Sequence, residues 1–341
     1  MSQWDAEKAR RLLCALGDHI RGEVMRRRAT LTTEELAGVV AHTEADAIYG
    51  IDRISESAIG EWFRRSWPSA WPVELVMEGG PEGGAGALTF PDGTPPSATL
   101  LKAIIDPVDG TRGIMYDKRP AWVLAGLAPQ KGVRTGLRDI GVAAMTEIPV
   151  MKQTRVDQIS TVRGKGRTGI VAQRLDLDSG RCAPLALAPS RATDFRHGFA
   201  ALVRFFPEGK ALTAKIEEEL WDELYGLGST RAPLIFDDQY ISTGGQFYEL
   251  LAGRDRMLGD LRPLVLRKLG LEQSLTCHPY DVAAALILEE AGIVFEHPEG
   301  GPVDVPLDTL SPVAWIGFAN PGLADQARPI VHRLIAEYLS P

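Results

Sequence analysis

Two aspartates and a threonine lie within six residues of one another, in the stretch Asp-Pro-Val-Asp-Gly-Thr that begins at Asp106. An apolar run precedes them and predicts a short buried strand. Pro107 biases Asp106 toward extended geometry, and Gly110 permits a tight turn. We therefore expect Asp106, Asp109 and Thr111 to crowd together where the strand ends. Oxygen ligands without nearby Cys or His suit a hard cation such as Mg²⁺, although the same six residues also fit an ordinary Asx turn.

Composition limits the classes of protein to which this chain can belong. Its 341 residues are 45% hydrophobic and 24% charged, which predicts two globular domains or one large one. The net charge of -8 argues against a groove for a nucleic acid polymer. Cys14, Cys182 and Cys277 are far apart, which favours a reducing compartment and no metal–thiolate site. No signal-peptide pattern or membrane-length apolar run is present, so we expect a cytoplasmic protein without a membrane partner.

Hydrophobic periodicity predicts helices near both ends of the chain and a mainly antiparallel sheet between them. The helices are expected at residues 5–27, 45–65, 209–225, 243–251, 281–291 and 329–339. The strands are expected at residues 100–105, 122–127, 141–148, 158–162, 169–173, 199–206 and 234–236. Thr243 and Gln246 have capping-box spacing, and Asp281 is expected at a helix N-terminus, where the dipole favours an acid. This order predicts a layered α/β architecture.

One glycine-rich segment imitates a nucleotide-binding turn. Residues 164–169 fit the pattern Gly-x-Gly-x-x-Gly, which in a dinucleotide site is followed by a helix. Here the next residues, Ile170-Val171-Ala172, are typical of a strand. We therefore interpret the segment as a hairpin turn.

Taken together, the motifs resemble the inositol monophosphatase family of metal-dependent phosphatases, whose superfamily includes the fructose bisphosphatases. The first family motif is present without change at Asp106–Thr111, and the second appears as Tyr280-Asp281-Val282-Ala283-Ala284 followed by Glu290-Ala291-Gly292. The remaining matches are weaker and occur in the expected order: Asp52 in an early helix, Glu78 after it, the glycine-rich hairpin at Arg163–Gly166, and the small-residue helix start at Thr243. The resemblance therefore spans nearly the whole chain.

The resemblance implies a fold, a reaction and an assembly. The fold would be the αβαβα sandwich of the sugar phosphatases, with residues 1–183 carrying the first motif and residues 184–341 carrying the second-motif aspartate. The reaction would be hydrolysis of a small phosphorylated metabolite with two or three Mg²⁺ ions. The candidate substrates are an inositol phosphate, a sugar phosphate or a nucleotide 3′-phosphate. The assembly would be a homodimer.

The resemblance also assigns roles to individual residues. The implied metal ligands are Glu78, Asp106, the Val108 carbonyl, Asp109 and Asp281. The implied catalytic residues, which activate the attacking water, are Glu78 and Thr111, with Asp52 accepting a hydrogen bond from the Thr111 hydroxyl. The implied phosphate and substrate contacts are Asp109, Gly110, Thr111 and Arg112.

Three departures from the family pattern leave the substrate open. Gly79 stands where the family has a second acid, which weakens the case for a third metal ion. Arg112 follows the threonine and either reaches a second anionic group of the substrate or pairs with a neighbouring aspartate. Ser274 stands where inositol-type enzymes have an acid that contacts substrate hydroxyls. An inactive family member that binds a phosphate ligand or acts as a scaffold is the alternative, and Gly79 favours it slightly.

Overall fold

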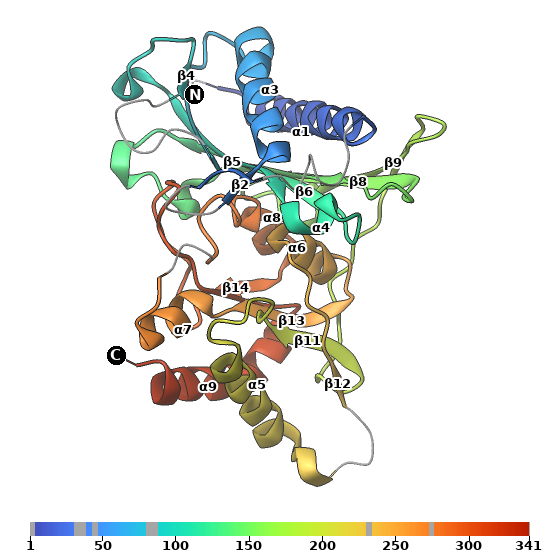
Figure 1. Cartoon of the computed structure of the whole chain (residues 1–341), viewed down its shortest axis with the longest axis vertical. Coiled ribbons are helices and arrows are strands. Elements are labelled where there is room, and N and C mark those ends of the chain that lie inside the picture. Colours follow the sequence, from blue (N-terminus) through green and yellow to red (C-terminus); the bar gives the residue numbers. More distant parts are fainter. Residues whose placement is uncertain are drawn as a thin grey trace.

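The computed structural model describes residues 4–30, 39–42, 47–79, 88–229, 234–272 and 276–340, and for residues 39–42 and 47–57 it describes the backbone alone. Figure 1 shows five layers that alternate between helices and sheets. From top to bottom they are α1 (Ala6–Arg28) with α3 (Gly50–Ser66), an eight-stranded sheet, α6 (Thr243–Leu251) with α8 (Ala285–Ala291), a five-stranded sheet, and α5 (Lys210–Tyr225) with α9 (Pro321–Tyr338). The αβαβα sandwich expected from the sequence is confirmed.

The larger sheet has the strand order β10-β9-β8-β7-β6-β5-β3-β4. Its strands are β3 (Val73–Met77), β4 (Leu88–Phe90), β5 (Leu101–Asp109), β6 (Ala121–Pro129), β7 (Val142–Ile148), β8 (Arg155–Val162), β9 (Val171–Asp176) and β10 (Cys182–Pro184). Only β3 and β5 pair in parallel among these neighbours. All nine residues of β5 are buried, since helices cover both faces of the sheet at this central strand.

The smaller sheet has the strand order β12-β11-β13-β15-β14. Its strands are β11 (Gly198–Leu202), β12 (Ile235–Phe236), β13 (Asp255–Asp260), β14 (Val294–Glu296) and β15 (Trp315–Phe318). Strand β11 pairs in parallel with β12 and β13, whereas β15 pairs antiparallel with β13 and β14. Helices α6 and α8 contact strands of both sheets, so the middle layer joins the two. The chain also contains α4 (Thr111–Met115), α7 (Arg262–Leu269), and the paired strands β1 (Val39–His42) and β2 (Ala47–Tyr49).

Two groups of buried apolar side chains hold the layers together. One group lies between the upper helices and the eight-stranded sheet and includes Leu13 and Phe63. The other fills the space around the middle layer and the five-stranded sheet, where the rings of Trp315 and Phe247 lie 5.3 Å apart, centroid to centroid. Within the described residues, no helix has the length and apolar character needed to cross a membrane. The proposed division of the chain at residue 183 stays a prediction.

Several sequence-based expectations are confirmed. The five strands predicted between residues 100 and 173 form consecutive antiparallel neighbours, β5 to β9. Residues 164–169 lie in the turn between β8 and β9, so the interpretation as a hairpin is correct.

Other expectations are wrong in position. The helix predicted from Asp281 begins at Ala285, and the strand predicted to Phe206 ends at Leu202. The last helix begins at Pro321 rather than near Pro329, because Asn320 caps it by accepting a hydrogen bond from the Leu323 N–H. The cap of α6 is Ser242, one residue before the predicted Thr243.

Candidate functional site

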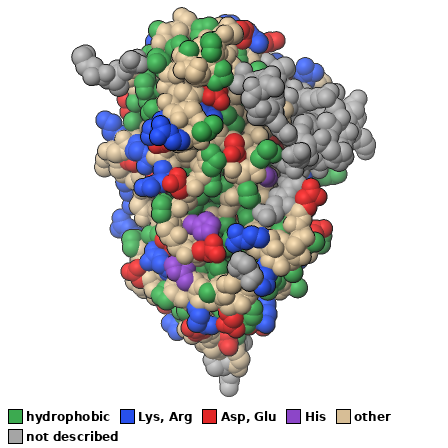
Figure 2. All heavy atoms as spheres, turned by 90° about the vertical axis from the view of Figure 1, so that its left-hand side faces the viewer, with side chains coloured by type: hydrophobic (Ala, Val, Ile, Leu, Met, Phe, Trp, Pro, Cys, Tyr) green, Lys and Arg blue, Asp and Glu red, His purple; other side chains and the backbone are tan. Residues whose placement is uncertain are grey.

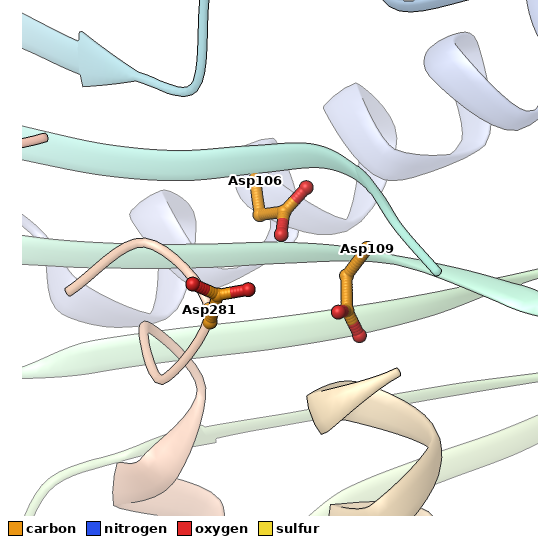
Figure 3. Close-up of side chains that lie close together, drawn as sticks. All are labelled: Asp106, Asp109 and Asp281. Atoms are coloured by element: carbon orange, nitrogen blue, oxygen red, sulfur yellow. The ribbon is translucent and has the colours of Figure 1, made fainter. Parts of the chain in front are cut away.

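Three carboxylates that the sequence separates meet in the middle of the molecule. Carboxylate oxygens of Asp106, Asp109 and Asp281 lie within 4.8 Å of one another. Figure 3 shows the first two at the end of β5 and the third facing them from the turn before α8. Asp106 and Asp109 are only 1% and 5% exposed, and the side chain of Asp281 is 20% exposed. The structure thus brings together the three aspartates predicted as metal ligands.

A bulge in β5 aims two of these side chains the same way. In a regular strand, residues three apart point to opposite faces of the sheet. Here Asp106 pairs with Leu124 and Asp109 pairs with Trp122, so three steps along β5 match two along β6. The extra residue restores a common direction, and Pro107, which has no N–H to donate, tolerates the broken ladder. This geometry explains why the motif holds its aspartates three residues apart with a proline between them.

Asp109 is held by the N-terminus of α6. Its carboxylate accepts hydrogen bonds from the Ser242 hydroxyl at 2.6 Å, the Gly244 N–H at 2.6 Å and the Thr243 N–H at 3.1 Å. Glycine at 244 permits this approach, since a Cβ there would lie 3.0 Å from a carboxylate oxygen of Asp109. Burial raises the pKa of Asp109 to about 6, and these hydrogen bonds limit the rise.

The carboxylates of Asp106 and Asp281 accept fewer hydrogen bonds that would stabilise their negative charge. Burial raises the pKa of Asp106 well above its ordinary value, and the charges of Glu78, Asp109 and Asp281 raise it further. Burial and the charge of Asp109 likewise raise the pKa of Asp281. Ionising such a cluster costs free energy that a bound cation would offset, and an all-oxygen donor set suits Mg²⁺ or a similar hard ion. The residues therefore fit a divalent metal site.

Glu78 reaches the same region through the parallel pairing of β3 and β5. It follows β3 directly, and its N–H donates to the Ile105 carbonyl at 3.3 Å. Parallel neighbours end at the same edge of the sheet, so Glu78 comes near enough for its charge to raise the pKa of Asp106. The next residue, Gly79, has a φ of 71°, which an acidic residue adopts only with strain. The position where the family has a second acid therefore favours glycine here.

Asp281 is oriented by its own turn and not by a helix. Its carboxylate accepts a hydrogen bond of 2.6 Å from the His278 N–H. The hydroxyl of Tyr280 lies 3.3 Å from Nδ1 of His278, and the two rings stack. The predicted contribution of a helix dipole at Asp281 is wrong, because α8 starts four residues later.

Thr111 and Val108 complete the turn of the first motif. The Thr111 hydroxyl donates to the Val108 carbonyl at 2.7 Å, and the Val108 N–H donates to Asp106 at 3.0 Å. Gly110 has a φ of 95°, and a Cβ on it would lie 2.9 Å from the Cβ of Ser242. Asp52 is on α3, but its side chain lies outside the described residues, as does the whole of Ser274.

Sequence reasoning missed three polar residues at this site. Ser242 was detectable as a serine preceding a helix, which is a favoured N-cap. Asp260 ends β13 and Arg262 begins α7 two residues later, and the Asp260 carboxylate accepts hydrogen bonds of 2.5 to 3.0 Å from the Arg262 guanidinium. The charge of Arg262 lowers the pKa values of Asp109 and Asp281, which places it beside the cluster.

Two arginines from distant segments share one aromatic ring near the cluster. The guanidinium carbons of Arg112 and Arg262 each lie 5.5 Å from the ring centroid of Phe206, and that of Arg262 also lies 4.8 Å from Phe205. These cation–π contacts help to fix the position of each guanidinium, and for Arg262 they add to the ion pair with Asp260. Arg112, which follows Thr111 directly, therefore meets Arg262 at Phe206, and its predicted contact with the substrate stays a prediction.

Solved structures share this fold although their sequences have diverged. Fructose-1,6-bisphosphatase from Leishmania major superposes with a TM-score of 0.64 and 14% identity, covering 95% of this chain and 92% of that one. Extragenic suppressor protein SuhB from Bartonella henselae gives 0.62 and 15%, covering 94% and 97%. Inositol monophosphatase II from Staphylococcus aureus gives 0.56 and 15%, covering 97% and 96%. No protein-family model and no curated protein sequence matches the chain. The resemblance found in the motifs is thus confirmed for the fold.

Proposed function

We propose that this chain is a metal-dependent phosphatase that hydrolyses a phosphate monoester of a small metabolite. The observation that carries the proposal is the convergence of three buried carboxylates within 4.8 Å. They lie in a fold shared with proteins described as an inositol monophosphatase and a fructose-1,6-bisphosphatase. A cluster of this kind lowers stability unless a cation occupies it, so a purely structural role does not account for it.

The proposed ligands of the cation are Asp106, Asp109, Asp281, Glu78 and the Val108 carbonyl. We propose two or three Mg²⁺ ions, which when bound would offset the charge of the phosphate and activate water. Asp106 is the proposed central ligand, and the charges of Glu78, Asp109 and Asp281 all raise its pKa, which supports this role. The hydrogen bonds from Ser242 and Gly244 fix the orientation of Asp109 before any ion binds.

The remaining residues of the first motif would bind the phosphate and manage the proton of the attacking water. The Gly110 and Thr111 N–H groups are the proposed phosphate contacts at the start of α4. Thr111 and Glu78 are the proposed acceptors for the proton of the water, with Asp52 as the partner of Thr111. The Thr111 hydroxyl donates to the Val108 carbonyl, a proposed metal ligand, at 2.7 Å, which supports its place at the site. Donation to Asp52 would require this proton to turn away from Val108.

Arg112 and Arg262 favour a substrate with a second anionic group. Both guanidinium groups lie on Phe206 beside the carboxylate cluster. Arg262 donates from Nε and Nη2 to Asp260, so it contributes its positive charge, and the planar guanidinium of Arg112 is the one that would bind phosphate or carboxylate in a bidentate manner. A sugar bisphosphate or a nucleotide 3′-phosphate fits this arrangement better than an inositol monophosphate. A homodimer, which rests on the resemblance, and a cytoplasmic location, which rests on the cysteine usage, remain parts of the proposal.

The test is phosphate release from a panel of substrates with and without Mg²⁺. The panel contains inositol 1-phosphate, fructose 1,6-bisphosphate, adenosine 3′,5′-bisphosphate and several sugar monophosphates. Asp109→Asn should lower kcat by about a hundredfold or more, since even supporting residues of metal sites cost 10- to 100-fold. The control Asp178→Asn, which changes an exposed carboxylate in the turn after β9, should retain wild-type turnover. Binding of phosphate esters without any Mg²⁺-dependent turnover would favour the inactive binding protein.

A further inference from the structure

A second charged cavity opens outside the carboxylate cluster. It has a volume of about 690 Å³, which is in the range of pockets that hold small molecules. Its lining combines four cationic side chains with three carboxylates and one proline: Lys131, Arg134, Arg138, Arg163, Asp139, Glu289, Asp304 and Pro302. Figure 2 looks at the left-hand side of Figure 1, and basic side chains gather there beside acidic ones.

Its walls come from four parts of the chain that are tied to one another. Residues 130–141 connect β6 to β7 and form one wall, and residues 302–304 form another. Backbone hydrogen bonds join these walls, from the Leu137 N–H to Val305 at 3.0 Å and from the Leu307 N–H to Thr135 at 2.9 Å. Arg163, directly after β8, donates to the Ile140 carbonyl at 2.8 Å. The cavity therefore has a fixed shape.

Ion pairs inside the cavity use up most of its acidic groups. Lys131 pairs with Asp139 at 2.6 Å, and Arg163 pairs with Glu289 of α8 at 2.9 Å. Burial raises the pKa of Asp139, but hydrogen bonds from Lys131 and the Gly136 N–H and the charges of Lys131 and Arg163 outweigh this and lower it. Asp304 is then the one carboxylate of the lining left to balance two arginines.

Arg134 and Arg138 are those two arginines. Neither guanidinium makes a hydrogen bond or an ion pair with any residue that the structure describes. Each lines the cavity from a short 3₁₀ helix, one at Gly132–Arg134 and the other at Leu137–Asp139. The whole chain has a net charge of -8, whereas the lining of this cavity carries more cationic than acidic side chains.

We propose that this cavity binds a small phosphorylated molecule through Arg134 and Arg138, separately from the carboxylate cluster. A guanidinium presents a planar fork of donors that matches two phosphate oxygens, and charge-assisted bonds of this kind are the strong ones. A divalent cation is the less suitable occupant, because the lining carries more cationic than acidic groups. Glu289 belongs to α8, whose preceding turn carries Asp281, so a ligand here would contact the element that supports the cluster.

The experiment is calorimetric titration of the full chain with pyrophosphate in the presence of EDTA. EDTA keeps the carboxylate cluster free of cations, so that its negative charge repels the probe. Wild type should show saturable binding that weakens as salt is raised. The double variant Arg134→Gln/Arg138→Gln should bind about tenfold more weakly or worse, because it removes the charge-assisted hydrogen bonds to the phosphate groups.

Two further double variants separate the explanations. Arg181→Gln/Arg191→Gln removes the same charge from exposed positions that do not line the cavity, and it should bind like wild type. Arg134→Lys/Arg138→Lys keeps the charge without the fork and should bind with intermediate affinity. The proposal is overturned if wild type shows no saturable binding or if the glutamine variant at 134 and 138 binds as tightly as wild type. Thermal melting of every variant checks that a loss of binding is not a loss of fold.

Discussion

Without a divalent cation, the buried carboxylates of the site should destabilise the folded chain. The pKa of Asp109 is about 6 in the folded chain against an ordinary 3.8. Each pKa unit corresponds to about 1.4 kcal/mol, so ionising this group costs the fold roughly 3 kcal/mol at neutral pH. The stability that its proton provides is fully present below about pH 4 and is lost as the pH rises through about 6. Asp106 and Asp281 act in the same direction, since their pKa values are also raised.

Replacing Asp106 with asparagine tests this reasoning. The variant keeps the shape of the side chain and an oxygen that can accept from the Val108 N–H, but it removes one charge from the cluster. In EDTA at pH 8, Asp106→Asn should be more stable than wild type by about 1 to 3 kcal/mol. With excess Mg²⁺ the order should reverse, because wild type gains the free energy of cation binding and the variant gains less.

Urea unfolding followed by tryptophan fluorescence measures these differences, with Trp122 and Trp315 as buried probes. Burial also raises the pKa values of Glu147 and Asp255 to about 7, but these groups are the same in both proteins, so the comparison isolates the cluster. The exposed control Asp178→Asn should change stability by less than about 0.5 kcal/mol. The reasoning is refuted if Asp106→Asn is less stable than wild type in EDTA at pH 8, or if wild type in EDTA gains stability between pH 5 and 8.

Three further variants probe the parts that support the cluster. Ser242→Ala removes both the cap of α6 and a hydrogen bond to Asp109. It should lower the free energy of unfolding in urea by about 1 to 2 kcal/mol and weaken Mg²⁺ binding in calorimetry. An unchanged Mg²⁺ affinity would contradict the role given to the hydroxyl. Gly110→Ala combines a φ of 95° with a Cβ that would lie 2.9 Å from Ser242, and a melting curve should show a loss of about 1 to 3 kcal/mol; an unchanged melting temperature would show that the turn adapts. Arg262→Gln should lower kcat/KM for a bisphosphate about tenfold relative to a monophosphate. Arg267→Gln on the same helix should leave that ratio unchanged, and an equal effect of both variants would remove Arg262 from substrate recognition.

Local patterns predicted a layered α/β fold and the crowding of Asp106 and Asp109, whereas the resemblance to a known family supplied the five-layer sandwich and added Asp281 as a ligand. Buried strands such as β5 have nearly continuous apolar sequences, and the motif from Asp106 to Thr111 is short and distinctive. The bulge that aligns Asp106 with Asp109 was not predicted, since it depends on how β6 pairs with β5. Arg262 was missed for a similar reason: its distance from the cluster is set by β13 and not by any spacing in the chain.

The misplaced helix start at Asp281 has a local cause. The sequence from Asp281 to Ala291 has strong helical character, but the Asp281 carboxylate accepts a hydrogen bond from the His278 N–H. Side-chain to backbone bonds of this type compete with the helix. The segment consequently forms turns with bonds three residues apart, such as Asp281 to His278 and Ala285 to Val282, until α8 begins. The residue that carries the predicted chemistry is also the residue that delays the helix.

The hydrogen bonds from Ser242, Thr243 and Gly244 to Asp109 join residues from the first half of the chain to residues from the second half at the site. Neither part contains the complete set of proposed metal ligands, so the cation site forms only when the two sheets pack against the middle layer. The measured affinity for the ion therefore also reports how well the two sheets pack together. A substitution that changes none of the proposed ligands, such as one that loosens the contact between the rings of Trp122 and Tyr248 at 5.1 Å, should weaken ion binding before it unfolds the chain.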